Sequence, residues 1–135
     1  MSERGARGYI FSRPHLGGNV PQRVQNLVIR DYCVRRGLRY LLSATEYAMP
    51  GCFMMLERVL DEAPGLEAIV LYSLFQLPET AAGRRAIYVR VLKAGTHLHA
   101  ALEDLMIRSP ADIGRIEDIW CLRQILPLCP QTLEA

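Results

Sequence analysis

The chain has 135 residues, of which 50% are hydrophobic and 22% are charged, with a formal net charge of +2. This length suits one domain with a continuous core. Such a small net charge, spread over scattered arginines, argues against a nucleic-acid partner, because phosphate backbones need a concentrated basic surface. No apolar run approaches the roughly 18 residues of a membrane-spanning helix, and the first seven residues are unlike a secretory signal. We therefore expect a cytoplasmic protein with neither membrane nor nucleic-acid partners.

The apolar pattern alternates between short buried runs and amphipathic segments. It predicts, in chain order, strand 9–11, helix 20–36, strand 38–44, helix 52–62, strand 66–74, helix 80–93, strand 97–102 and a last helix from Ser109. The last helix has a Ser cap, then Pro110, and an acid at Asp112, which is a typical helix start. The run 66–74 is continuous and apolar, as expected of a central strand covered on both faces.

Strands that alternate with helices through short connections predict a parallel sheet with right-handed crossovers. We expect an α/β fold, a three-layer sandwich with a four-stranded parallel sheet in the flavodoxin-like order 2-1-3-4. The single domain spans 1–135, with 1–6 and 129–135 as loose tails. In such sheets ligands bind at the carboxyl ends of the strands, so the polar residues there are the candidates.

The first candidates follow the first strand. Ser12 and Arg13 are suited to hold a phosphate or carboxylate, and His15 to act as a general acid or base. Alternatively, Ser12 caps a turn, while Arg13 and His15 are solvated. Arg23 and Asn26 lie early in the following helix, beside the same loop, and are candidates to contact a ligand; a solvated helix face explains them nearly as well.

Glu46 is the strongest candidate for acid/base chemistry, because it leaves the second strand next to Tyr47. Tyr47 would contact the substrate, and the alternative for Glu46 is a cap on the next helix or a partner for Arg13. Further candidates for substrate binding follow the third and fourth strands: Ser73, Gln76 and Glu103.

Cysteines and histidines give no metal or cofactor signal. Cys33, Cys52, Cys121 and Cys129 contain no close C-x-x-C pair, so we expect free thiols rather than a zinc ribbon or redox dithiol. The H-x-H-x-x-x-E run that starts at His97 looks like a cupin metal motif, but its ends would be about 20 Å apart on a straight strand. We expect no metal and no cofactor.

Several strings resemble a small family known as sporadic carbohydrate cluster proteins: 8–14 (GYIFSRP), 20–33 (VPQRVQNLVIRDYC), 45–47 (TEY), 55–57 (MLE) and 72–78 (YSLFQLP). The resemblance extends from about residue 7 to 125. That family is named for gene neighbourhoods that make surface carbohydrates and related sugar-bearing products, without an assigned reaction. The resemblance therefore implies a pathway rather than a mechanism.

At longer range the layout is similar to the catalytic domain of serine recombinases, which also implies a resolvase-like strand order. This chain departs from their Tyr-x-Arg-x-Ser pattern, because Phe11 stands at the arginine position and Arg13 at the serine position. The run 75–78 (FQLP) has no paired arginines to hold a phosphodiester. DNA strand exchange is therefore not expected.

Two functions remain. The first is a small enzyme of sugar or nucleotide-sugar metabolism that uses Glu46, His15 and Ser12 for isomerisation, dehydration or glycosidic-bond cleavage. The second is a non-catalytic ligand-binding or scaffold protein of the same pathway, with the last helix around Trp120 as a candidate partner surface, although core packing explains Trp120 equally well. A homo-oligomer is compatible with either function.

Overall fold

The computed structural model describes residues 4–14 and 18–125. Its elements are β1 (Ala6–Phe11), α1 (Gln22–Arg36), β2 (Tyr40–Glu46), α2 (Met54–Glu62), η1 (Ala63–Gly65), β3 (Ala68–Leu71), η2 (Leu74–Gln76), α3 (Ala81–Lys93), β4 (His97–Ala100), β5 (Leu105–Ile107), η3 (Pro110–Asp112) and α4 (Ile113–Ile125). The α/β alternation is confirmed. The predicted role of His15 and the tail 129–135 lie outside the described residues.

Within residues 4–14 and 18–125 the sheet has five strands, in the order β2-β1-β3-β4-β5. The first four pair in parallel, whereas β5 pairs with β4 in the antiparallel direction. The prediction of an all-parallel, four-stranded sheet is therefore wrong at this edge. The tight connection between β4 and β5 places Asp104 in the left-handed region, at φ 58°. It carries no Gly, Asn-Gly or Asp-Gly signal, so the sequence pattern hides the hairpin.

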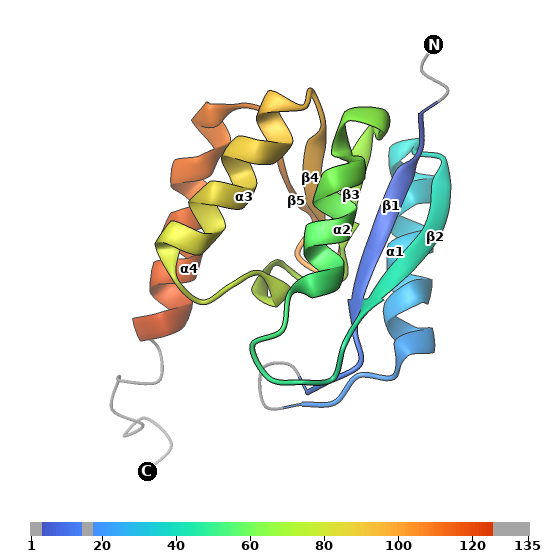
Figure 1. Ribbon diagram of the computed structural model, residues 1–135, viewed down its shortest axis with the longest axis horizontal. Coiled ribbons are helices and arrows are strands. Elements are labelled where there is room, and N and C mark those ends of the chain that lie inside the picture. The colour runs from blue at the N-terminus through green and yellow to red at the C-terminus, as the bar shows by residue number, and fades with distance from the viewer. Residues whose placement is uncertain (1–3, 15–17, 126–135) are drawn as a thin grey trace.

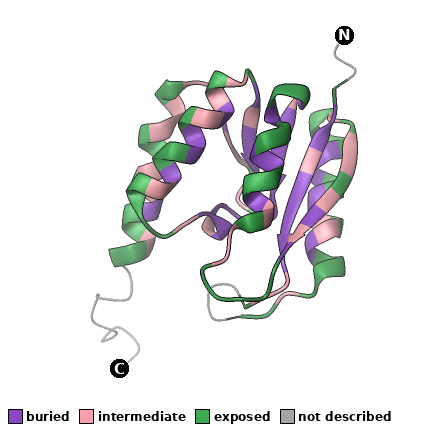
Figure 2. Ribbon diagram, viewed as in Figure 1, coloured by how far each residue is buried: buried purple, intermediate pink, exposed green. Residues whose placement is uncertain are grey.

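Helices cover both faces of the sheet, with α1 on one side and α2, α3 and α4 on the other (Figure 1). The four residues of β3 are fully buried, as the apolar run predicted. Figure 2 shows buried residues along the sheet and on the inward sides of the helices. Trp120 and Ile116 pack into the larger core on the α2–α4 side, so core packing accounts for the apolar side of α4.

The apolar pattern of 20–36 predicts a buried stripe of Val24, Leu27, Val28 and Tyr32, widened by Ile29 and Cys33, and the structure confirms it in part. Tyr32, Ile29 and Cys33 are buried, whereas Val24 and Leu27 are 41% and 59% exposed. Gln25 completes the buried face, which it shares with Ile29 and Cys33 at a spacing of four residues. The helix is therefore rotated so that a glutamine points at the sheet.

Close approach of β1 to β2 depends on Gly8. A Cβ at this position would lie 2.2 Å from Ser43 Oγ, so a larger residue would have to displace the Ser43 side chain. The two strands bring Phe11 and Glu46 into register at their carboxyl ends. Among the described residues no helix is long and apolar enough to cross a membrane.

Candidate functional site

Glu46 is the last residue of β2, and its side chain is only 1% exposed. Oε1 accepts hydrogen bonds from the Tyr9 hydroxyl at 2.8 Å and the Leu56 N–H at 3.1 Å. Oε2 accepts from the N–H groups of Tyr47 and Met55, both at 3.0 Å. The amides of Met55 and Leu56 belong to the first turn of α2, so the Glu46 carboxylate caps a helix that lacks a side-chain cap of its own.

These bonds decide the charge of Glu46. Burial by itself opposes ionisation, but the hydrogen bonds from Met55, Tyr9 and the neighbouring amides outweigh it, so the pKa of Glu46 is lowered. Both oxygens are engaged, and the carboxylate holds no proton to donate near neutral pH. The geometry is that of a structural anion, and the acid/base role of Glu46 stays a prediction.

Ser12 and Arg13 tie the end of β1 to the β2–α2 connection. The Ser12 hydroxyl donates to the Glu46 carbonyl at 2.6 Å. Arg13 Nη1 donates to the carbonyl oxygens of Tyr47 at 3.0 Å and Cys52 at 2.8 Å. The Arg13 guanidinium also lies 4.0 Å from the centroid of the Phe11 ring, a cation–π distance. Arg13 is thus held in place by the fold, and no ion pair joins it to Glu46 within the described ranges.

Gln25 is the residue that the sequence reading missed. It is 2% exposed, and its Nε2 donates to the carbonyls of Phe11 and Val20, both at 2.9 Å. Its Oε1 accepts from the Phe11 N–H and from Gln76 Nε2, both at 3.0 Å. The signal was its spacing of four from Ile29 and eight from Cys33, the face that α1 buries.

Ser73, Gln76 and Glu103 form a second group at the ends of β3 and β4. Glu103 accepts from the Ser73 hydroxyl at 2.6 Å and from the Leu74 N–H at 2.8 Å. Gln76 Oε1 accepts from the Ser73 N–H at 3.5 Å, which closes a capping box around η2. Since Gln76 also bonds to Gln25, Gln25, Ser73, Gln76 and Glu103 form one hydrogen-bond network, while the Glu46 carboxylate has its own donors beside it. We call Gln25, Glu46, Ser73, Gln76 and Glu103 the polar rim.

The remaining predicted site residues lie elsewhere. Arg23 is exposed on α1, and Asn26 accepts a 3.5 Å hydrogen bond from the Tyr40 hydroxyl. Tyr47 is 45% exposed and contributes backbone groups to the contacts described above.

A cleft of about 810 Å³ lies beside the polar rim, between the β1 and β2 ends, η2 and α4. Its lining includes all three phenylalanines of the chain and its one tryptophan: Phe11, Phe53, Phe75 and Trp120. We call this space the aromatic cleft. Phe75 and Trp120 meet edge to face, with ring centroids 4.9 Å apart. Among the described residues predicted for the site, Arg13 is the one that lines the cleft.

The Trp120 wall is supported by a buried ion pair that the sequence did not indicate. Arg84, which is 3% exposed, donates from Nε and Nη2 to the two oxygens of Glu117 at 2.8 and 2.9 Å. Its guanidinium lies 4.2 Å from the Trp120 ring centroid. Tyr88 also donates to Glu117, so α3 and α4 are joined at this point. Each partner holds the other charged: the pKa of Glu117 is lowered by Arg84, and that of Arg84 is raised by Glu117.

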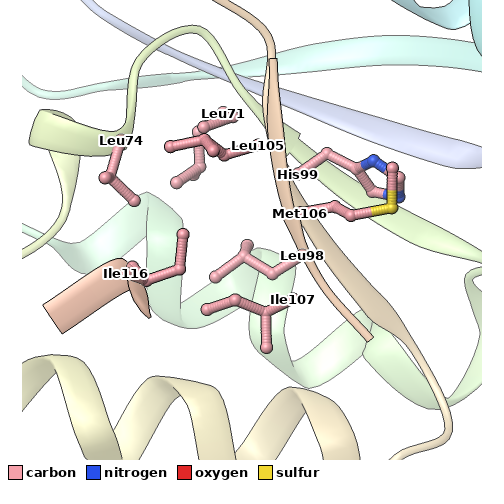
Figure 3. Close-up of a pocket in the computed structure, with 9 residues that line it drawn as sticks. Leu71, Leu74, Leu98, His99, Leu105, Met106, Ile107 and Ile116 are labelled. Atoms are coloured by element: carbon pink, nitrogen blue, oxygen red, sulfur yellow. The ribbon is translucent and has the colours of Figure 1, made fainter. Parts of the chain in front are cut away.

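Figure 3 shows a different hollow, where Leu74, Leu98 and Ile116 converge between the sheet and α4. It holds about 10 Å³, barely the space of one water, so it is a packing defect rather than a ligand site. His99 and Met106 point to the other side of the sheet (Figure 3). His99 Nδ1 pairs with the Tyr32 hydroxyl at 2.6 Å, whereas its Nε2 is buried without a partner among the described residues. No group of three or more His, Cys, Asp or Glu within that part of the chain is arranged to hold a metal.

Comparison with known proteins gives a fold and no family. No protein-family model and no curated protein matches the sequence. Solved structures do match, among them the following two. A resolvase family site-specific recombinase from Streptococcus pneumoniae has a TM-score of 0.63 and 12% identity, covering 96% of this chain and 94% of its own. The N-terminal catalytic domain of TP901-1 integrase has a TM-score of 0.58 and 12% identity, covering 90% and 96%. At such low identity this chain shares the resolvase-like α/β fold, and the likeness extends no further than the fold.

Proposed function

We propose that this protein binds a sugar or nucleotide sugar in the aromatic cleft, as a ligand-binding protein of a carbohydrate or natural-product pathway. One observation carries the proposal: every phenylalanine and the one tryptophan of the chain line the same cleft. Aromatic rings stack on the faces of nucleobases and provide large apolar contact areas for the C–H faces of sugars. A volume of about 810 Å³ lies in the range of small-molecule sites.

The polar rim supports binding rather than catalysis. The Glu46 carboxylate is occupied by four hydrogen bonds of 2.8–3.1 Å, and Gln25, Ser73 and Gln76 spend their polar atoms on backbone and on one another. A group that serves as a general acid or base needs access to the substrate proton. The acid/base enzyme of sugar metabolism therefore remains the second hypothesis, and its test is Glu46→Gln, which removes turnover if Glu46 is the catalytic group.

Fluorescence of Trp120 gives a direct test, because the chain has one tryptophan and it lines the cleft. Glucose, UDP-glucose and a duplex DNA oligonucleotide would be titrated separately, with calorimetry as a second readout. We expect UDP-glucose or glucose to change the emission in a saturable way, and DNA to leave it unchanged.

The matched variants are Phe53→Leu, in the cleft wall, and Met54→Leu, its neighbour, which is 56% exposed and does not line the cleft. We expect Phe53→Leu to weaken binding about tenfold and Met54→Leu to leave it unchanged, since a stacked ring contributes on the order of 1–3 kcal/mol. Equal behaviour of the two variants, or saturable binding of DNA alone, would remove the proposal. Self-association stays a prediction, and light scattering of the same samples measures it.

A further inference from the structure

Two arginines line the aromatic cleft without a carboxylate partner in the part of the chain that the structure describes: Arg13 and Arg123. Deeper in the wall, Arg84 is neutralised by a bidentate bond to Glu117 and so belongs to the scaffold. The difference matters because a buried or half-buried guanidinium is stable when an anion satisfies its fork of N–H donors. Arg13 and Arg123 offer that fork to the cleft.

Arg13 is positioned in advance. Its hydrogen bonds to the described residues all leave from Nη1 and reach backbone carbonyls of the β2–α2 connection. Its guanidinium lies near Phe11 and Phe53, at 4.0 and 5.2 Å from their ring centroids. No described residue accepts a hydrogen bond from Arg13 Nε or Nη2. A donor that the fold already orients loses little side-chain entropy when a ligand arrives.

Arg123 approaches the same space from the last turn of α4. Its guanidinium lies 5.9 Å from the Phe75 ring centroid, and it makes no hydrogen bond to a described residue. The acidic residue of the lining is Glu79, whose side chain is exposed and whose backbone carbonyl is bound by Arg84 and Gln124. The lining therefore combines two guanidinium groups with one carboxylate.

We propose that the ligand of the aromatic cleft carries a diphosphate or phosphate group, which Arg123 and Arg13 bind, next to a ring that stacks on the Phe75–Trp120 wall. The chemical class is a nucleoside diphosphate or its sugar ester, in preference to a neutral sugar. Guanidinium binds phosphate through paired, charge-assisted N–H···O bonds, and the aromatic wall accommodates the planar base beside it. This inference rests on the proposed function, because it concerns the same cleft.

The experiment compares UDP, uridine, inorganic pyrophosphate and glucose, each titrated against the full chain by calorimetry and Trp120 emission. We expect UDP to bind at least tenfold more tightly than uridine, and its affinity to fall as sodium chloride is raised, since charge pairing at an open cleft is screened. Pyrophosphate separates the affinity that comes from the phosphates from the affinity that comes from the stacked base. If pyrophosphate binds as tightly as UDP, the site recognises phosphate alone, and the proposal of a nucleoside ligand is overturned.

Arg123→Gln is the test variant, and Arg115→Gln is its control. Arg115 is exposed on the same helix, at the end away from the cleft, and each change removes one positive charge. We expect Arg123→Gln to weaken UDP binding about tenfold to a hundredfold, as expected for charged hydrogen bonds, without changing glucose or uridine affinity. Arg115→Gln should match the wild type, which excludes a general effect of net charge.

The outcomes separate this inference from the proposed function. If glucose or uridine binds and responds to Phe53→Leu while Arg123→Gln has no effect on UDP, the phosphate contact is wrong and the aromatic cleft remains a binding site. If none of the four probes binds, both proposals fail. If Arg123→Gln lowers the melting temperature, Arg123→Lys decides: restored stability without restored UDP affinity supports the bidentate phosphate contact, and full recovery of both contradicts it.

Discussion

The polar rim and the aromatic cleft lie side by side at the carboxyl edge of the sheet, yet they use their side chains in opposite ways. In the polar rim, Gln25 and Glu46 are 2% and 1% exposed, and their polar atoms are spent on the protein itself. In the aromatic cleft, Phe53, Phe75 and the two arginines are partly exposed, and the more deeply buried Phe11 and Trp120 complete the lining. The polar residues at the strand ends thus stabilise the fold, whereas the side chains that line the cleft are mostly aromatic. The following predictions separate the two regions by stability and by binding.

The largest effect should come from Glu46→Ala. The change leaves the N–H groups of Met55 and Leu56 and the Tyr9 hydroxyl without their acceptor, in a site that water scarcely reaches. We expect the free energy of unfolding to fall by roughly 4 kcal/mol, because several buried donors lose their partners together. Urea denaturation measures it. Glu57→Ala, on the exposed side of α2, is the control and should cost under about 1 kcal/mol.

Gln25→Ala should be next, at roughly 3 kcal/mol. It removes the hydrogen bonds that Gln25 makes to the N–H and the carbonyl of Phe11, together with the link to Gln76. A double-mutant cycle with Gln76→Ala measures the coupling, and we expect the two losses to be clearly less than additive because they share one bond. Additive losses in the free energy of unfolding would show that Gln25 and Gln76 stabilise the fold independently of each other.

His99 supplies the contrasting case, a buried group that is only half satisfied. Burial, with the charges of His97 and Arg36, lowers its pKa to about 4. In the unfolded chain the pKa is about 6.5, so between these values only the unfolded state takes up the proton. The contribution of the neutral His99 to the free energy of unfolding should therefore be fully present above pH 6.5. The free energy of unfolding should fall by roughly 2 kcal/mol from pH 6.5 to 5.

His99→Asn removes the titrating group and keeps an amide near the Tyr32 hydroxyl, which His99 Nδ1 contacts in the wild type. Denaturation curves of this variant at pH 6.5 and pH 5 should give nearly equal free energies. If the wild-type protein is equally stable at both pH values, the pKa of His99 is the same in the folded and unfolded chain. That result would contradict a pKa lowered by burial.

The smallest effect should come from Arg13→Lys. A lysine keeps the charge but loses the planar contact with Phe11 and the paired hydrogen bonds from Nη1 to the carbonyls of Tyr47 and Cys52. We expect a loss of roughly 1 kcal/mol in the free energy of unfolding, with Arg115→Lys unchanged. If the free energy of UDP binding falls by more than the free energy of unfolding, Arg13 contributes more to the ligand than to the fold.

The sequence predicted the fold well where local chemistry was strong. The buried run of β3, the capped start at Ser109 and the alternation of strands and helices all appear in the structure. It failed at β5, because three residues after a turn without glycine carry no periodic signal. It also set the buried stripe of α1 partly wrong, since the apolar Val24 and Leu27 were included and the polar Gln25 was left out.

Of the candidate site, the sequence indicated which residues lie together at the strand ends, but not how their side chains are used. Ser12, Arg13 and Glu46 do meet at one edge, but a sequence does not show whether a carboxylate faces solvent or four donors. That distinction depends on how the chain folds back after β2, since the amides of Tyr47 and of Met55 and Leu56 in the first turn of α2 all bond to Glu46. The aromatic cleft was not predicted because its four aromatic residues are far apart along the chain. In the sequence pattern each of them is typical of a core residue.

The two borders of the sheet have a bearing on how the protein avoids precipitation. A strand with free backbone groups invites pairing with a neighbouring molecule. Here one border is β5, which is only three residues long, and the other is β2, whose register shifts between its pairings with Ala6 and Gly8. A short border and an irregular one are poor templates for a foreign strand. We expect concentrated solutions to resist fibre formation, and any pairing of copies to use helix surfaces instead.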